Sequence, residues 1–175
     1  MNAQKQFLEE TTNPTDQIDI ETCALLFASE FQPDLKVSDT VLELDAQVRH
    51  LLATAPVFDE TRTQNAHFLI DAVGGVLGYR GDNVEYHSAD NGFLNNVIST
   101  RLGMPITLAA IYVAVGKRLG ISVHGVGLLG HFLVRVKEAD GTGTIVDPFA
   151  HVIIPEAQFE TLTDTARINY GVFFD

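Results

Sequence analysis

The residues with the clearest potential for chemistry lie in the second half of the chain, at the ends of two predicted strands. His131 opens an apolar run, and Asp147 closes the next apolar run along the chain. If the two strands pair, the imidazole and the carboxylate occupy neighbouring positions, where the acid can hold the histidine in one tautomer. Such a pair is typical of the base and the orienting acid of a nucleophilic triad.

A helix that should be buried is predicted to start close to this pair. Pro105 suits the first turn of a helix, and the residues from there to Val115 are apolar almost all round. The free amides of its first turn would point toward His131 and Asp147, which favours a nucleophile or a bound anion at that place. The combination indicates acyl-transfer chemistry.

The elements that position these residues can be predicted from hydrophobic spacing. Three strands are predicted, over 122–128, 131–136 and 144–146. Helices are predicted from Ile20 to Phe31, from about Val41 to Leu52 and from Thr63 to Leu77, with a short helix around Val97. Because the strands follow one another through short connections, we expect an antiparallel sheet. The fold class is therefore α+β, with N-terminal helices and a buried central helix packed on that small sheet.

The chain length fits one domain, for which we expect four parts. These are a flexible leader over 1–17, a helical subdomain with its connecting loop over 18–90, a core over 91–155, and a tail over 156–175 packed on the core. The connecting loop is longer than most connections, which is typical of functional loops. We expect Tyr79, Arg80, Asn91 and Pro105 to line a ligand cleft beside His131 and Asp147.

Composition argues against several classes of partner. The formal charge is -12, with 23 acidic against 11 basic residues, so nucleic-acid backbones and anionic lipid surfaces are repelled. Cys23 is the only cysteine, which excludes an intramolecular disulfide and a cysteine-based metal site. The N-terminal stretch lacks the basic flank and apolar run of a secretion signal. We therefore expect a cytoplasmic protein with no nucleic-acid or membrane partner.

Three motifs in order along the chain resemble one family. The segments FLNNVISTRLGMPITLAAIYVAVGKRLGI, GVGLLGHFLVRV and IVDPF are similar to the SirB-type branch of the transglutaminase-like superfamily, over roughly residues 18 to 155. This resemblance implies a papain-like fold in which His131 and Asp147 belong to a Cys-His-Asp triad. Counted back from the helix end at Leu119-Gly120, the family's cysteine falls on Pro105. The usual thioester chemistry therefore has no nucleophile here.

Two residues could be considered in place of the missing cysteine. Thr107 lies in the first turn of the same helix and could be activated by His131. Two residues along a helix rotate a side chain by about 200 degrees, however, which turns Thr107 away from the cysteine position. The alternative is that Thr107 caps the helix or packs. Cys23 lies on the inner stripe of the first helix and is interpreted as a small core residue.

The histidine and aspartate pair also has readings without catalysis. His131 and Asp147 could tie two strands together as a hydrogen-bonded couple, or they could contribute to a ligand site. A metal site built from His124, His131, His151 and Asp147 matches no standard ligand spacing, so we expect neither a metal nor a cofactor.

The leading hypothesis is a non-catalytic transglutaminase-like module, a pseudoenzyme that binds a peptide, a protein or a small-molecule ligand beside His131 and Asp147. The alternative is a hydrolase or acyltransferase that uses Thr107 or an activated water, with His131 as base and Asp147 as the orienting acid. A third reading is an interaction domain that works through its helical first half. The apolar segment Tyr170 to Phe174 is expected to pack on the core or on a second copy, which would make a homodimer.

Overall fold

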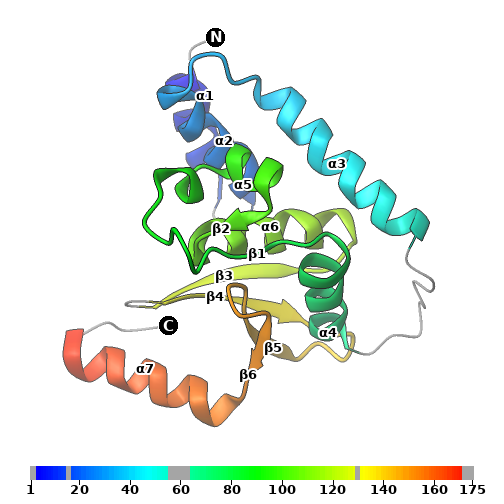
Figure 1. The fold of residues 1–175 in the computed structure, drawn as a ribbon. Coiled ribbons are helices and arrows are strands. Elements are labelled where there is room, and N and C mark those ends of the chain that lie inside the picture. The colour runs from blue at the N-terminus through cyan, green and yellow to red at the C-terminus, as the bar shows by residue number, and fades with distance from the viewer. Residues whose placement is uncertain (1–2, 15–16, 55–63, 129–130, 171–175) are drawn as a thin grey trace.

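The fold is described by a computed structural model that covers residues 3–14, 17–54, 64–128 and 131–170 (Figure 1). Helices form the first part of this region. In chain order they are α1 (Ala3–Thr11), α2 (Ile20–Phe31), α3 (Val37–Thr54), α4 (Asn65–Ile70) and the π-helical turn η2 (Asp71–Val76). A loop with a short 3-10 helix, η3 (Ala89–Gly92), leads to α5 (Leu94–Thr100) and to the long helix α6 (Pro105–Arg118).

The strands come after α6, as expected. They are β3 (Val123–Leu128), β4 (His131–Lys137), β5 (Gly143–Asp147) and β6 (Val152–Ile154), and they form an antiparallel sheet in the order β3-β4-β5-β6. Two further short strands, β1 (Arg80–Gly81) and β2 (Leu102–Gly103), pair in parallel and bring the loop next to the start of α6. The last element is α7 (Glu156–Tyr170). The predicted α+β fold is confirmed.

Helix α6 is the central helix, and the sequence explains both of its ends. Pro105 occupies the first turn, and the Thr107 side chain accepts a hydrogen bond from the backbone amide of Met104, 3.1 Å away. At the other end Gly120 adopts φ +70, a left-handed conformation that glycine reaches without steric conflict. Lys117 and Arg118 lie in the last turn, where positive charge is favourable to the helix dipole.

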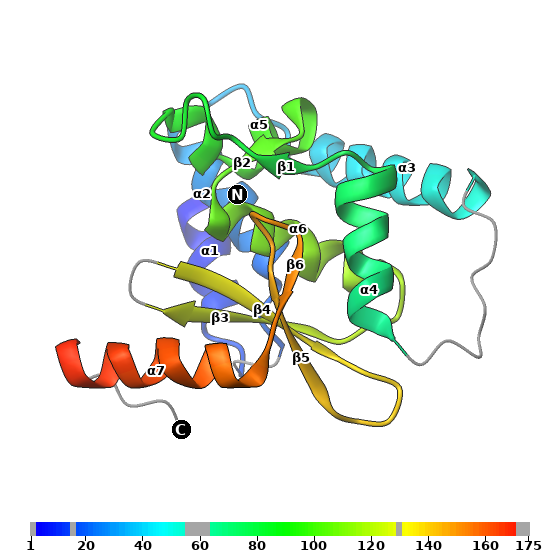
Figure 2. The same cartoon turned by 60° about the horizontal axis from the view of Figure 1, so that its bottom comes forward.

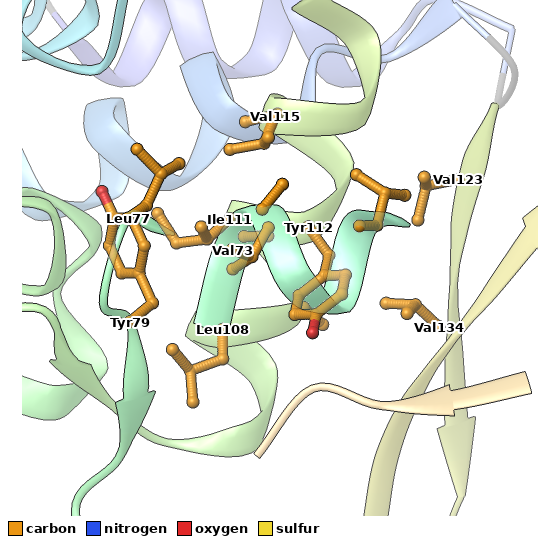
Figure 3. Packing of buried hydrophobic residues seen from close by; sticks show 14 of the residues in the cluster. Val73, Leu77, Tyr79, Leu108, Ile111, Tyr112, Val115, Val123 and Val134 are labelled. Atoms are coloured by element: carbon orange, nitrogen blue, oxygen red, sulfur yellow. The ribbon is translucent and has the colours of Figure 1, made fainter. Parts of the chain in front are cut away.

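The hydrophobic core surrounds this helix (Figure 3). Leu108, Ile111 and Val115 are fully buried. Figure 3 shows Tyr79 and Leu77 on one side of the helix and Val123 and Val134, from the sheet, on the other. In Figures 1 and 2, α2, α5 and α6 lie on one side of the sheet and α7 lies on the opposite side.

A buried ion cluster fastens the end of α6 to two other helices. The Arg118 guanidinium donates to both carboxylate oxygens of Glu21 on α2, at 2.6 and 3.0 Å, and to Asp45 on α3 at 2.7 Å. Burial lowers the pKa of Arg118, but its hydrogen bonds to the two carboxylates outweigh this effect and the pKa lies above its usual value. The cluster holds α2 and α3 against the central helix.

The structure differs from the sequence expectations in several places, among them the unpredicted short strands β1 and β2. The leader expected to be flexible contains α1, which packs on α2 and whose Glu10 accepts a hydrogen bond from the Asp19 amide at 2.9 Å. Helix α3 begins at Val37, before the expected start. The helix predicted up to Leu77 changes from α to π at Asp71. Strand β6 was not predicted. The expected packing of Tyr170 to Phe174 falls on side chains outside the described part.

Candidate functional site

The start of α6 is where the family resemblance implies a nucleophile. Pro105 is the first helical residue and has neither a thiol nor a hydroxyl. The hydroxyl of Thr107 is buried and lies 2.7 Å from the carbonyl oxygen of Asn91, to which it donates, while it accepts from the Met104 amide. The hydroxyl proton is therefore engaged in joining η3 to α6. These contacts favour the capping role of Thr107 over the nucleophile role.

His131 lies at the first position of β4, opposite Leu128, and its side chain is exposed. The next residue, Phe132, points to the α6 side of the sheet, where it packs against the core. Because neighbouring side chains on a strand point to opposite faces, His131 lies on the face away from α6. The structure does not bring His131 and Thr107 together.

Asp147 ends β5 and caps the turn that follows. Its Oδ1 accepts from the backbone amides of Phe149 and Ala150, at 2.8 and 3.1 Å. Val146 on β5 pairs with Val134 on β4. If this register continues by one residue, the position opposite Asp147 on β4 is two residues from His131. Within the described residues the two side chains form no hydrogen bond. The acid is used to shape a turn, and the imidazole stays in solvent.

A different histidine, His151, lies in this turn and packs against Tyr112. Its backbone has φ +55, its ring stacks on Tyr112 with 5.8 Å between centroids, and its Nδ1 lies 2.7 Å from the Tyr112 hydroxyl oxygen. Its Nε2 is buried and has no hydrogen-bond partner of good geometry among the described residues. Burial lowers the pKa of His151, and the Tyr79 carbonyl and the Asp147 charge only partly oppose that effect. Burial also raises the pKa of Tyr112.

Two glycines make room for the turn from Asp147 to His151. A methyl group on Gly74 would lie 2.9 Å from Cγ and Nδ1 of His151, and one on Gly81 would lie 2.5 Å from the ring of Phe149. Glycine is unfavourable inside a helix, but at position 74 it has a packing reason, because a side chain there would meet His151. In the sequence His151 stands out only as a possible metal ligand, and no local pattern indicates that it is partly buried.

The residues expected to line a cleft serve different purposes. The hydroxyl of Tyr79 donates to Gln47 at 2.6 Å and accepts from Arg101 at 3.0 Å, and burial raises its pKa to about 12. The Asn91 side-chain amide donates to Asp82 at 3.1 Å and holds the loop together. Arg80 is exposed on β1. Asn91 lies beside the start of α6, where its carbonyl oxygen accepts a hydrogen bond from Thr107.

An apolar cavity of about 380 Å³ lies beside that helix start. It is bounded by α1, α2, α6 and the sheet, and its largest side chains are Phe7, Ile20, Phe27, Ile106 and Phe132. The volume falls within the range of small-molecule sites, and such sites are mostly lined by apolar groups. The cavity is on the α6 side of the sheet, whereas His131 and Asp147 belong to the opposite face.

Cys23 also lines this cavity and is only partly buried, rather than being a core residue. Burial, followed by the charges of Glu10 and Asp19, raises the pKa of its thiol. Since the thiolate is the reactive form, Cys23 is a poor nucleophile at neutral pH.

Across the described ranges, no group of three or more His, Cys, Asp or Glu side chains could hold a metal ion. None of the described helices is long and apolar enough to cross a membrane.

Together, the buried helix and the antiparallel sheet that follows it define an α+β protein of the transglutaminase-like class. A family profile described as the transglutaminase-like superfamily matches residues 28–169, and the chain belongs to this superfamily.

Several curated proteins are similar to this chain. A UPF0162 protein of Xylella fastidiosa is 49% identical over 73 residues, which are 42% of this chain and 26% of that protein. A UPF0162 protein of Pasteurella multocida is 29% identical over 120 residues, 66% of this chain and 45% of that protein. F-box only protein 21 of Mus musculus is 29% identical over 90 residues, 49% of this chain and 14% of that protein. The chain thus spans less than half the length of these relatives. No solved structure is significantly similar to it.

Proposed function

We propose that this chain is a non-catalytic transglutaminase-like module of the SirB-type branch, which binds an apolar ligand in the cavity beside the start of α6. The proposal is supported by the start of the central helix. Its first residue is Pro105, where the family resemblance implies the nucleophile, and the residues directly after it, Ile106 and Thr107, line an apolar cavity.

The absence of catalysis is supported by the arrangement of the remaining candidate groups. A triad needs the base within hydrogen-bond reach of the nucleophile. The Thr107 hydroxyl instead donates to Asn91, and His131 lies on the other face of the sheet. A hydrolase that uses Thr107 or a water activated by His131 therefore has no support from this geometry.

The cavity favours an apolar group as the ligand. Its lining combines aromatic rings with small residues such as Ala109, Ala110 and Gly125. A side chain on Gly125 would lie 3.1 Å from the ring of Phe132, so the missing side chain helps to keep this ring in place. The cavity volume of about 380 Å³ can accept a small apolar molecule or a large side chain from a peptide or a protein.

A titration with the neutral fluorophore N-phenyl-1-naphthylamine tests the binding role. Gly92 lines the cavity and has no atom within 4 Å of an added Cβ, so Gly92→Leu should fill part of the space and weaken binding about tenfold. Gly75→Leu is the matched control, because Gly75 also has open space around an added Cβ but lies in η2, away from the cavity. Equal binding by both folded variants and the wild type would remove the support for a ligand in this cavity.

A further inference from the structure

An exposed aromatic cluster lies at the rim of the cavity. Phe27 and Phe31 on α2 are 51% and 62% exposed, and both rings contact Phe93, which directly precedes α5. The ring centroids are 5.1 Å apart for Phe27 and Phe31, 6.5 Å for Phe27 and Phe93, and 5.7 Å for Phe31 and Phe93. We call these three rings the aromatic rim. Single exposed apolar residues are common, but a contiguous group of this kind marks an interaction site.

The apolar surface continues from the aromatic rim along α2. Ile20 is 41% exposed and Ile106, at the start of α6, is 52% exposed, and both line the cavity together with Phe27. The spacing from Ile20 through Phe27 to Phe31 follows one stripe of the helix, and at 1.5 Å per residue it extends for about 16 Å. A stripe of that length matches about three turns of a second helix placed alongside, with the cavity as a socket for one of its side chains.

Carboxylates flank the aromatic rim. Glu30 precedes Phe31, Asp34 follows the end of α2, and Asp90 lies three residues before Phe93. All three are exposed, and in the part of the chain that the structure describes none of them forms an ion pair. The whole chain carries a net charge of -12. The field around the aromatic rim therefore attracts a positively charged partner and repels an anionic one.

We propose that the aromatic rim and the cavity bind a cationic amphipathic helix of a partner protein. The apolar stripe of that helix lies on Phe27, Phe31 and Phe93, one large side chain enters the cavity, and lysine or arginine residues beside the stripe face Glu30 and Asp34. The inference rests on the proposed binding function and names the class of its ligand. A second copy of this chain fits less well, because pairing two such surfaces would bring their unpaired carboxylates together.

The test uses an 18-residue synthetic helix of leucine and lysine, with leucines at i, i+3, i+4 and i+7 spacing, followed by fluorescence anisotropy. Two peptides serve as controls: one has the same composition with the leucines scattered, and the other replaces lysine with glutamate. The amphipathic lysine peptide should bind at least about tenfold more tightly than either control. Its affinity should fall as the salt concentration rises. Equal binding of the scattered peptide or the glutamate peptide would overturn the proposal.

Variants of the protein test whether the peptide binds at the aromatic rim. Phe31→Ser should weaken binding about tenfold, whereas Leu42→Ser, at a residue 58% exposed on α3, should leave it unchanged. Glu30→Gln combined with Asp34→Asn should weaken binding severalfold and reduce its salt dependence. The control pair Glu156→Gln and Glu160→Gln removes the same charge from α7 and should have little effect.

The outcomes separate this inference from the function on which it rests. Peptide binding that is insensitive to Phe31→Ser, or that both charge pairs weaken equally, would overturn the helix proposal. If the neutral fluorophore still bound and Gly92→Leu still blocked it, the proposed function would stand. Concentration-dependent dimerisation that Phe31→Ser abolishes, with no peptide binding, would assign the surface to a second copy and also overturn the proposal.

Discussion

The hydroxyl oxygen of Tyr112 lies 2.7 Å from Nδ1 of His151 inside the fold, where the imidazole also occupies the space left open by Gly74. This contact links the central helix to the turn that follows Asp147. It explains why the turn is held in place although its histidine has a left-handed backbone conformation, with φ +55. The partly buried His151 is therefore a packing element between α6, η2 and the sheet.

Removing the Tyr112 hydroxyl should destabilise the fold. Tyr112→Phe leaves Nδ1 of His151 without its partner in a largely buried position, which costs about 1–2 kcal/mol. Urea unfolding followed by circular dichroism measures the effect. Tyr86→Phe is the control, because Tyr86 is 40% exposed, and this change should be close to neutral. Equal stability of the two variants would contradict the role of the contact.

Stability should depend on pH through His151. Burial lowers its pKa below the usual 6.5 in the folded state, so the unfolded chain binds a proton first as the pH falls. The free energy of unfolding is therefore unaffected by this group above pH 6.5 and decreases as the pH falls below that value. Unfolding curves from pH 8 to pH 5 should show a steeper loss for the wild type than for His151→Gln, and parallel curves would argue against a buried neutral imidazole.

Gly74 should tolerate no side chain. A methyl group there would lie 2.9 Å from the imidazole of His151, so Gly74→Ala should cost about 1–3 kcal/mol by overpacking. The neighbouring Gly75 has nothing within 4 Å of an added Cβ, so Gly75→Ala should be neutral or slightly stabilising. The midpoints of urea unfolding of the two variants are compared. If Gly74→Ala costs less stability in the His151→Ala background, its effect comes from the contact with the His151 ring.

Arg118 should be required for stability through its buried partner Glu21. Replacement by alanine leaves Glu21, which is 6% exposed, without its counter-charge, and breaking such a buried pair costs about 3–5 kcal/mol. Arg49→Ala removes an exposed arginine from α3 and should change the free energy of unfolding by no more than about 0.5 kcal/mol. Thermal unfolding gives the melting temperatures of both variants. Similar melting temperatures would contradict the proposed contribution of the ion cluster to stability.

The central helix and the first three strands of the sheet could be predicted because their residues are apolar at regular spacing. Strand β6, Val152–Ile154, is too short for its alternation to be recognised. Helix α1 has no buried residue, and Phe7 and Leu8 are the only large apolar residues in its sequence, so its composition resembles that of a polar loop. Contacts with α2 stabilise this helix in the fold, and such tertiary contacts cannot be predicted from the local sequence of α1.

The site was harder to predict than the fold. Whether His131 or Phe132 faces α6 depends on the register of a single residue, and a shift by one reverses every side chain of the strand. The position of the His151 ring depends on Gly74, which is far away in sequence and leaves room for the imidazole because it has no side chain. The position of Pro105 at the helix start, by contrast, was predicted, because proline suits a first turn.

The central claim, that no acyl-transfer chemistry occurs at the start of α6, is tested most directly by turnover. Ammonia release from a glutamine-containing peptide and hydrolysis of p-nitrophenyl acetate are measured for the wild type, Thr107→Ala and His131→Ala, with His87→Ala as a matched exposed histidine. We predict that all four proteins show the rate of the buffer alone. Turnover by the wild type that is lost in folded Thr107→Ala and His131→Ala, but kept in His87→Ala, would contradict the account.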